Sequence, residues 1–181
     1  MTRAATIALA LGLGLLGAGD AATMTGTDAV RPAFAEMRWP FLLDQWGPGR
    51  AYRCPAAACA GEVGLFVRGK NGFCNCYNGV ADDDEIDRIG DVDMHSLDFV
   101  PLAPGRVTRI GDRAGRRRAF RVTTAGAGRQ VLSIVVASKC NALVATVVSA
   151  GELSPVVERA VYDLLEGAPV QRFIAQASVE P

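Results

Sequence analysis

The residues whose types and spacing can do chemistry are, first of all, the five cysteines. Four of them form two close pairs, Cys54-x4-Cys59 and Cys74-x-Cys76, and Cys140 stands alone. Thiols of an exported protein bond to one another by default, whereas thiolates can also hold a soft metal ion. The spacing leaves both chemistries open.

As disulfides, the cysteines allow several pairings. A Cys54–Cys59 bond would close a short loop and contribute roughly 2 kcal/mol in the chain-entropy estimate. Cys74 and Cys76, as alternate strand residues, are too constrained to bond to each other. Either can bond to Cys140, closing a loop of about 65 residues for near 4 kcal/mol, or the two close pairs can bond to each other. Because five is an odd number, one thiol stays free or pairs between molecules.

A cysteine-based metal-binding or thiol redox factor is the alternative functional hypothesis, and it would use Cys54, Cys59, Cys74 and Cys76. Residues i and i+2 of a strand share a face, so Cys74 and Cys76 can chelate together. The spacing differs from the paired C-x2-C of zinc ribbons, and no C-x-x-C opens a helix to activate a thiol. We therefore favour structural cysteines and expect no cofactor.

The single histidine limits catalysis. Because His95 is the only histidine, a bis-histidine centre is excluded. The chain also has neither a C-x-x-C-H haem motif nor a G-x-S-x-G nucleophile turn. We expect His95 to be a loop or surface residue rather than a base. The sequence thus favours a non-enzymatic protein with no catalytic residues, and an enzyme that uses carboxylates of residues 82–98 is a third hypothesis.

Charged side chains are segregated along the chain. Eight carboxylates lie close together: Asp82, Asp83, Asp84, Glu85, Asp87, Asp91, Asp93 and Asp98. Eight arginines follow: Arg106, Arg109, Arg113, Arg116, Arg117, Arg118, Arg121 and Arg129. The acidic stretch lacks the calcium-loop pattern, because Ile86 stands where a third ligand belongs. The two stretches either face each other or form a bipolar surface that orients a charged partner.

Two groups of side chains are candidates for contact with a partner protein. Arg116, Arg117 and Arg118 are expected at a hairpin tip, where they would also discourage edge-to-edge aggregation. Trp39, Phe41 and Trp46 lie in one short segment, and packing on the core is the favoured interpretation. Exposed aromatic anchors for a partner are the alternative.

Local patterns predict the elements that must position these residues. Strands are expected over residues 62–68, 106–110, 117–124, 130–138 and 142–149, and the Asn71-Gly72 turn would begin a returning strand over 73–77. Asp82 should cap a helix over 83–89. Ser154-Pro155 should begin a second helix that Gly167 ends, and a last helix is expected over 170–177. Pro40 should begin a short helical turn that Gly47-Pro48-Gly49 ends. The class is α+β: an antiparallel sheet of about 5–6 strands with C-terminal helices packed on one face.

The N-terminus has the pattern of an export signal. An apolar run over residues 4–18 follows Arg3, and small residues come next. We therefore expect a cleaved signal peptide over 1–21, a flexible leader over 22–37 and one domain over 38–181. The mature form is not expected to span a membrane, because no later run is long and apolar enough.

Composition points to the compartment. With 50% hydrophobic and 21% charged residues and a formal net charge of zero, the chain lies in the globular range. Arginine outnumbers lysine by 17 to 2, a bias typical of high-GC bacteria, and the exported compartment is then the periplasm. Nucleic acid is not an expected partner there, and no small-molecule substrate is identifiable.

Three blocks of the chain carry a resemblance. Trp39-Pro40-Phe41 with Asp44-Gln45-Trp46-Gly47, then Arg53-Cys54, then Gly72-Phe73-Cys74-Asn75-Cys76 resemble small exported proteins of alphaproteobacteria that carry no assigned activity. The resemblance covers residues 38–100 best and implies export, but no fold, substrate or catalytic residue. Our functional hypothesis is therefore a periplasmic, non-enzymatic accessory protein that binds or helps assemble a partner protein.

Overall fold

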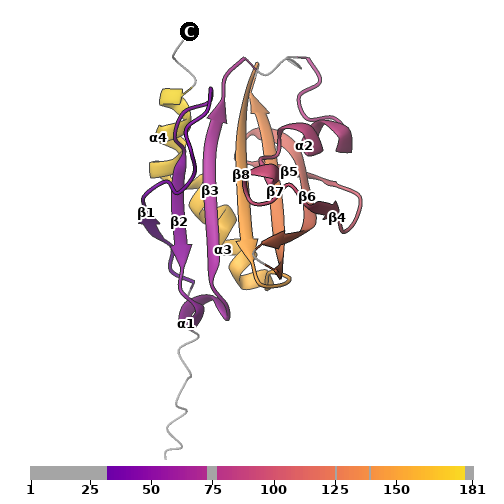
Figure 1. Ribbon diagram of the computed structural model, residues 1–181. Helices are drawn as coiled ribbons and strands as arrows, with labels where there is room; N and C mark the ends of the chain where they lie inside the picture. Colours follow the sequence, from indigo (N-terminus) through magenta and orange to yellow (C-terminus); the bar gives the residue numbers. More distant parts are fainter. Residues whose placement is uncertain (1–31, 73–76, 125, 139, 178–181) are drawn as a thin grey trace, which may run out of the picture.

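The computed structural model describes residues 32–72, 77–124, 126–138 and 140–177. Within them the chain forms an antiparallel sheet of 8 strands in the order β1-β2-β3-β8-β7-β6-β4, and β5 pairs with β6 beside β4 (Figure 1). The elements are β1 (Ala35–Met37), β2 (Arg50–Cys54), α1 (Ala56–Cys59), β3 (Val63–Lys70), α2 (Asp83–Ile89), the 3-10 turn η1 (Val92–Met94), β4 (Phe99–Pro101), β5 (Arg106–Ile110), β6 (Arg113–Thr124), β7 (Ala127–Ser138), β8 (Asn141–Ser149), α3 (Pro155–Glu166) and α4 (Ala168–Ala177).

The α+β class is confirmed, but the expected strand number was too low. The strands that the sequence analysis missed are β1, β2 and β4, of three, five and three residues. Such short segments carry too few residues for a period-2 pattern to stand out. The expected returning strand over 73–77 falls largely outside the described residues. β3 pairs instead with β2 on one side and β8 on the other.

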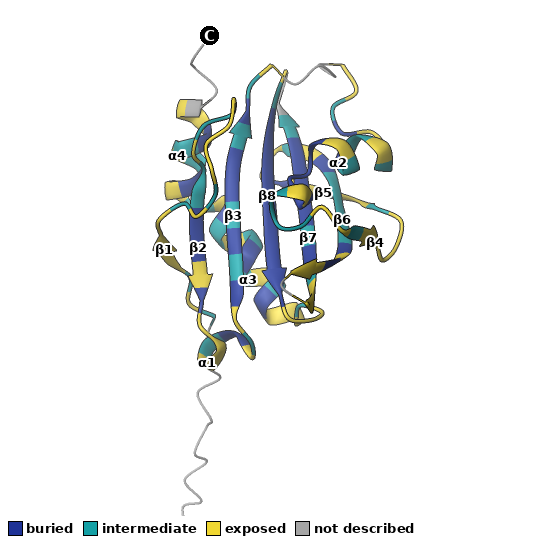
Figure 2. Ribbon diagram, viewed as in Figure 1, coloured by how far each residue is buried: buried dark blue, intermediate teal, exposed yellow. Residues whose placement is uncertain are grey.

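The long strands β7 and β8 are covered on both faces, and their sequences are nearly continuously apolar. On β8, Leu143, Ala145 and Val147 face the layer formed by α3 and α4, and they are buried with Val161 and Leu165 of α3. The alternate residues of β8 face the opposite layer. Nearly the whole of β8 is therefore buried (Figure 2). This alternation places two apolar cores on the two sides of one sheet.

The C-terminal helices cover one face, and α2 and η1 cover the other. Ile86 and Ile89 of α2 pack against Val135 of β7 and Val144 of β8. The helix begins where its cap was predicted, because Asp82 accepts a hydrogen bond from the Glu85 amide at 2.9 Å. On the other face, Ser154 caps α3 in the same manner.

The segment before β2 is where the sequence interpretation was wrong. Pro40 begins no helix: residues 38–49, named the strap here, have no regular secondary structure apart from a bend at Phe41 and a turn at 45–46. Phe34 packs on the α3–α4 core and β1 pairs with β2, so part of the expected flexible leader belongs to the folded domain.

No helix among the described residues is long and apolar enough to cross a membrane.

Candidate functional site

The aromatic residues of the strap pack onto the sheet, as the favoured interpretation predicted. The ring of Phe41 lies 5.2 Å from Trp39, 5.0 Å from Phe66 of β3 and 5.1 Å from His95, measured between centroids. Trp39 and Phe41 are half-buried. The large apolar side chains that the strap exposes are Leu42 and Leu43, at 93% and 70%.

A buried ion network holds the strap and η1 against β3. The Arg68 guanidinium donates two hydrogen bonds to Asp91 at 2.6 Å and two to Asp44 of the strap at 2.7 and 2.8 Å. Lys70 Nζ lies 2.6 Å from Asp91 Oδ1 and 5.7 Å from the centre of the Trp46 ring. Arg68, Lys70 and Asp91 are buried. Burial alone would raise the pKa of Asp44, but its hydrogen bonds from Arg68 and the Trp46 amide outweigh that effect and lower the pKa.

Arg116, Arg117 and Arg118 were expected at a hairpin tip, but they lie within β6. The three side chains alternate between the two faces of the sheet, as neighbours on a strand do. Arg116 pairs with Asp83 at 2.6 Å and Arg118 with Asp87 at 2.6 Å, both on α2, whereas Arg117 pairs with Glu158 of α3 on the other face. The two charged stretches face each other in part, through Arg116 and Arg118, whereas the other arginines of the basic stretch form no ion pair with the acidic stretch within the described residues. Arg116, Arg117 and Arg118 therefore hold helices on the sheet.

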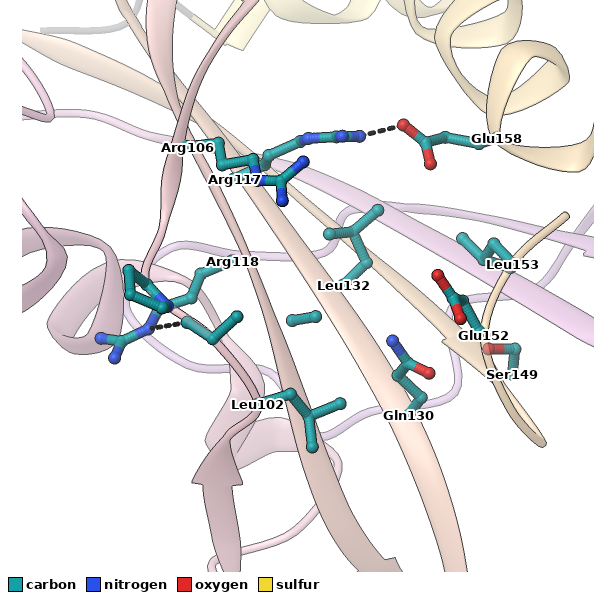
Figure 3. A pocket seen from close by; sticks show the side chains of 13 residues that line it. Leu102, Arg106, Arg117, Arg118, Gln130, Leu132, Ser149, Glu152, Leu153 and Glu158 are labelled. Carbon is teal, nitrogen blue, oxygen red and sulfur yellow. Dashed lines mark hydrogen bonds and ion pairs between the residues drawn. The ribbon is translucent and has the colours of Figure 1, made fainter. Parts of the chain in front are cut away.

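A hollow of about 360 Å³ lies beside α3, and we call it the helix-side groove (Figure 3). Its sides are the β4–β5 linker and the β8–α3 connection. Its apolar lining is formed by Leu102, Ala119, Leu132 and Leu153, and its polar lining includes Arg106, Arg117, Gln130, Ser149, Glu152 and Glu158.

A smaller hollow of about 260 Å³ adjoins the helix-side groove and shares Leu102 and Gln130 with it. Arg121 and Arg129 line this extension. In the described part of the chain, Arg106, Arg121 and Arg129 form no ion pair, in contrast to Arg116, Arg117 and Arg118. The positive charges of Arg106 and Arg121 are therefore available to a ligand at the groove, whereas Arg129, opposite Val122, lies on the other face of the sheet.

A second hollow of about 400 Å³ lies on the opposite face, between the strap and η1. Met37, Phe41, Phe66, Met94 and His95 give it a largely apolar lining. Its rim carries the Arg53–Glu62 ion pair, whose nitrogen and oxygen are 2.6 Å apart. Much of this lining is the aromatic cluster that seats the strap, so we assign it to folding.

His95 is part of that aromatic cluster rather than a surface residue. Its Nε2 lies 2.9 Å from Thr146 Oγ1, and its ring contacts Phe41 and Phe66. Burial disfavours the charged imidazolium and lowers the pKa of His95 from 6.5 to about 4, against the opposing pull of the Asp91 and Asp93 carboxylates. At neutral pH the ring is uncharged.

Because of this histidine, the stability of the protein decreases as the pH falls. Between pH 6.5 and about 4 the unfolded chain binds a proton at His95 that the folded chain does not, so the free energy of unfolding decreases as pH falls through that window. Above pH 6.5 His95 is neutral in both the folded and the unfolded chain, so this group no longer changes the free energy of unfolding. We expect His95→Gln, which keeps a donor for Thr146 and cannot titrate, to flatten this dependence in urea titrations across the window. An equally steep loss in His95→Gln would contradict the assignment.

Two of the five cysteines form a disulfide within the described chain. Cys54, at the end of β2, bonds to Cys59, at the end of α1, and both side chains are buried. Cys140 is disulfide-bonded as well. Cys74 and Cys76 lie outside the described residues. In this state Cys54 and Cys59 offer no thiolate to a metal or to an exchange reaction.

The described residues bring together no group of three or more histidine, cysteine or acidic side chains able to hold a metal ion. The buried charges of Arg68, Lys70 and Asp91 are balanced once Asp44 of the strap is included. The helix-side groove presents an apolar surface flanked by arginines.

The sequence analysis missed most residues of the helix-side groove. Arg106 and Arg121 were noted only as members of a basic stretch, and Leu102, Leu132 and Leu153 were not singled out. One signal was present, because Arg117 and Arg121 share a strand face with Ala119 between them. Which side chains lie opposite that face depends on strand register, which the local sequence does not show.

Comparisons with known proteins give no independent evidence on what the helix-side groove binds. No protein family matches the chain, and no curated protein matches it at a significant level. Among solved structures, the chain is similar to a protein of unknown function from Pseudomonas aeruginosa, at 12% identity and a TM-score of 0.41. That match covers 75% of this chain and 81% of the other. A likeness this distant supports no statement about function.

Proposed function

We propose that this protein is a periplasmic, non-enzymatic accessory protein that binds a partner protein in its helix-side groove. One observation carries the proposal: an apolar surface lies open next to arginines that form no ion pair in the described chain. Protein-binding surfaces combine an apolar centre with a polar rim, and they are enriched in arginine. Leu102, 41% exposed, is the large apolar side chain of this groove that is open to contact.

Three features support the periplasmic part of the proposal. The Cys54–Cys59 disulfide fits an oxidising compartment. The apolar run over residues 4–18 and the resemblance to exported alphaproteobacterial proteins point the same way. The cysteine-based alternative is less well supported, since two of its four ligands are bonded to each other.

Site-specific photocrosslinking in cells that produce the protein tests the proposal. A benzoylphenylalanine at position 102, inside the groove, should give one discrete protein adduct in the periplasmic fraction. The matched control is the same residue at position 156, because Val156 is 63% exposed on α3 and does not line the groove. Adducts of equal yield from both positions, or none from position 102, would overturn the proposed function.

A further inference from the structure

The charges and apolar side chains of the groove follow a spacing that specifies its occupant. We propose that the groove binds an extended segment of the partner with carboxylates at residues i and i+4 and an apolar side chain at i+2. This inference rests on the proposed function and adds the chemistry of the partner. It follows from the register of β5, β6 and β7.

One end of the groove presents Arg106. Arg106 of β5 lies directly opposite Arg117 of β6, so both side chains are on the same face. Arg117 is neutralised by Glu158 of α3. Arg106 has no such partner within the described residues, which leaves one uncompensated positive charge at this end.

The other end presents Arg121, on the same face of β6 and four residues beyond Arg117. A strand advances about 3.3 Å per residue, so the two positions are roughly 13 Å apart. Arg121 lies opposite Gln130 of β7, whereas the neighbouring Arg129 points to the other face of β7 and also lines the hollow beside the strap. Neither arginine forms an ion pair in the part of the chain that the structure describes.

Between the two cationic ends the surface is apolar. Ala119 stands midway on β6 and lies opposite Leu132 of β7, and Leu102 and Leu153 flank them. A small alanine at the centre leaves room for a side chain of the partner. The single acidic group near the middle without an ion pair is Glu152 of the β8–α3 connection, so cations predominate over the described lining.

An extended peptide has the same repeat as the strand beneath it. Its residues i, i+2 and i+4 point to one side, and i and i+4 are about 13 Å apart. Carboxylates at i and i+4 therefore reach Arg106 and Arg121 while the apolar side chain at i+2 meets Leu132 and Leu102. A helix would bring residues i and i+4 only about 6 Å apart, which does not match this spacing.

Fluorescence anisotropy with labelled peptides tests this occupant on the mature protein. The probe is a seven-residue serine peptide with glutamates at positions 2 and 6 and leucine at position 4. It should bind at least fivefold more tightly than versions with glutamine at both positions, or with the second glutamate moved to position 5. Its affinity should fall as salt is raised, because the contacts are exposed ion pairs.

Charge reversal locates the site. Arg106→Glu and Arg121→Glu should each weaken the probe about fivefold or more, the scale of one exposed ion pair. The matched control is Arg159→Glu, an exposed arginine of α3 that lies outside the groove and should leave affinity unchanged. Thermal melts of the three variants should coincide with the parent protein, so that lost binding does not reflect unfolding.

Two results would overturn the inference. One is equal affinity for the glutamate and glutamine peptides, and the other is an equal loss in Arg159→Glu and Arg106→Glu. If either occurs while position 102 still gives its adduct, the partner binds in the groove through other chemistry and the proposed function stands. If position 102 gives no adduct, both proposals fail together.

Discussion

Replacing Asp91 with asparagine should lower the free energy of unfolding by about 3–5 kcal/mol, because it removes the anion from a buried ion network. Arg68 and Lys70 both contact this carboxylate and are buried themselves. Asp44, which is half-exposed, would be left to compensate for Arg68 alone. Asparagine keeps the size of the side chain and tolerates the backbone φ of 57° at this position.

Urea unfolding near neutral pH measures this loss. Asp93→Asn is the matched control, since it makes the same chemical change two residues away at an exposed position and should stay within about 0.5 kcal/mol of the parent. Release of the strap should also change the fluorescence of Trp46, which lies over Lys70. Equal stability of the two variants would show that the network does not hold the fold.

Truncating Phe120 to alanine should cost about 3–5 kcal/mol, the range for removing a fully buried aromatic side chain. Phe120 is 0% exposed and packs with Val92, Val122 and Val131, and its ring meets Phe99 at 5.8 Å. It points away from the helix-side groove. Its neighbours on β6, Ala119 and Arg121, line that groove and its extension. Phe120 thus packs β6 against the core on the face opposite the proposed binding surface.

Val100→Ala is the control for Phe120→Ala. Val100 belongs to β4, opposite Arg121, but is 52% exposed, so little buried volume is lost. Denaturant titration of both variants should give a difference of at least about 2 kcal/mol. A smaller difference would mean that the core on this face rearranges to fill the space.

Much of the domain was predictable because its signals are local. Asp82 and Ser154 cap α2 and α3 at the positions that their sequences indicate. β5 begins and ends as predicted, and β7 and β8 were found through long apolar runs. In each case the residues that decide the structure lie within a few positions of one another.

The candidate site was predictable only in part, because its members are brought together by strand pairing. The sequence treated Arg116, Arg117 and Arg118 as one group at a tip. In the fold, two of them bind α2 and the third binds α3. Likewise, the cysteine pattern allowed a Cys54–Cys59 bond among several pairings, and the positions of β2 and α1 selected it.

The sequence by itself thus determined the α+β class, the capped helices, the buried central strands and the supply of unusually many arginines. Only the tertiary structure decided which arginines are neutralised and which remain available at a groove. The physical reason is that neighbouring strand residues point to opposite faces, while pairing register joins residues far apart in the chain. Arg106, Ala119 and Leu132 meet in one groove for that reason.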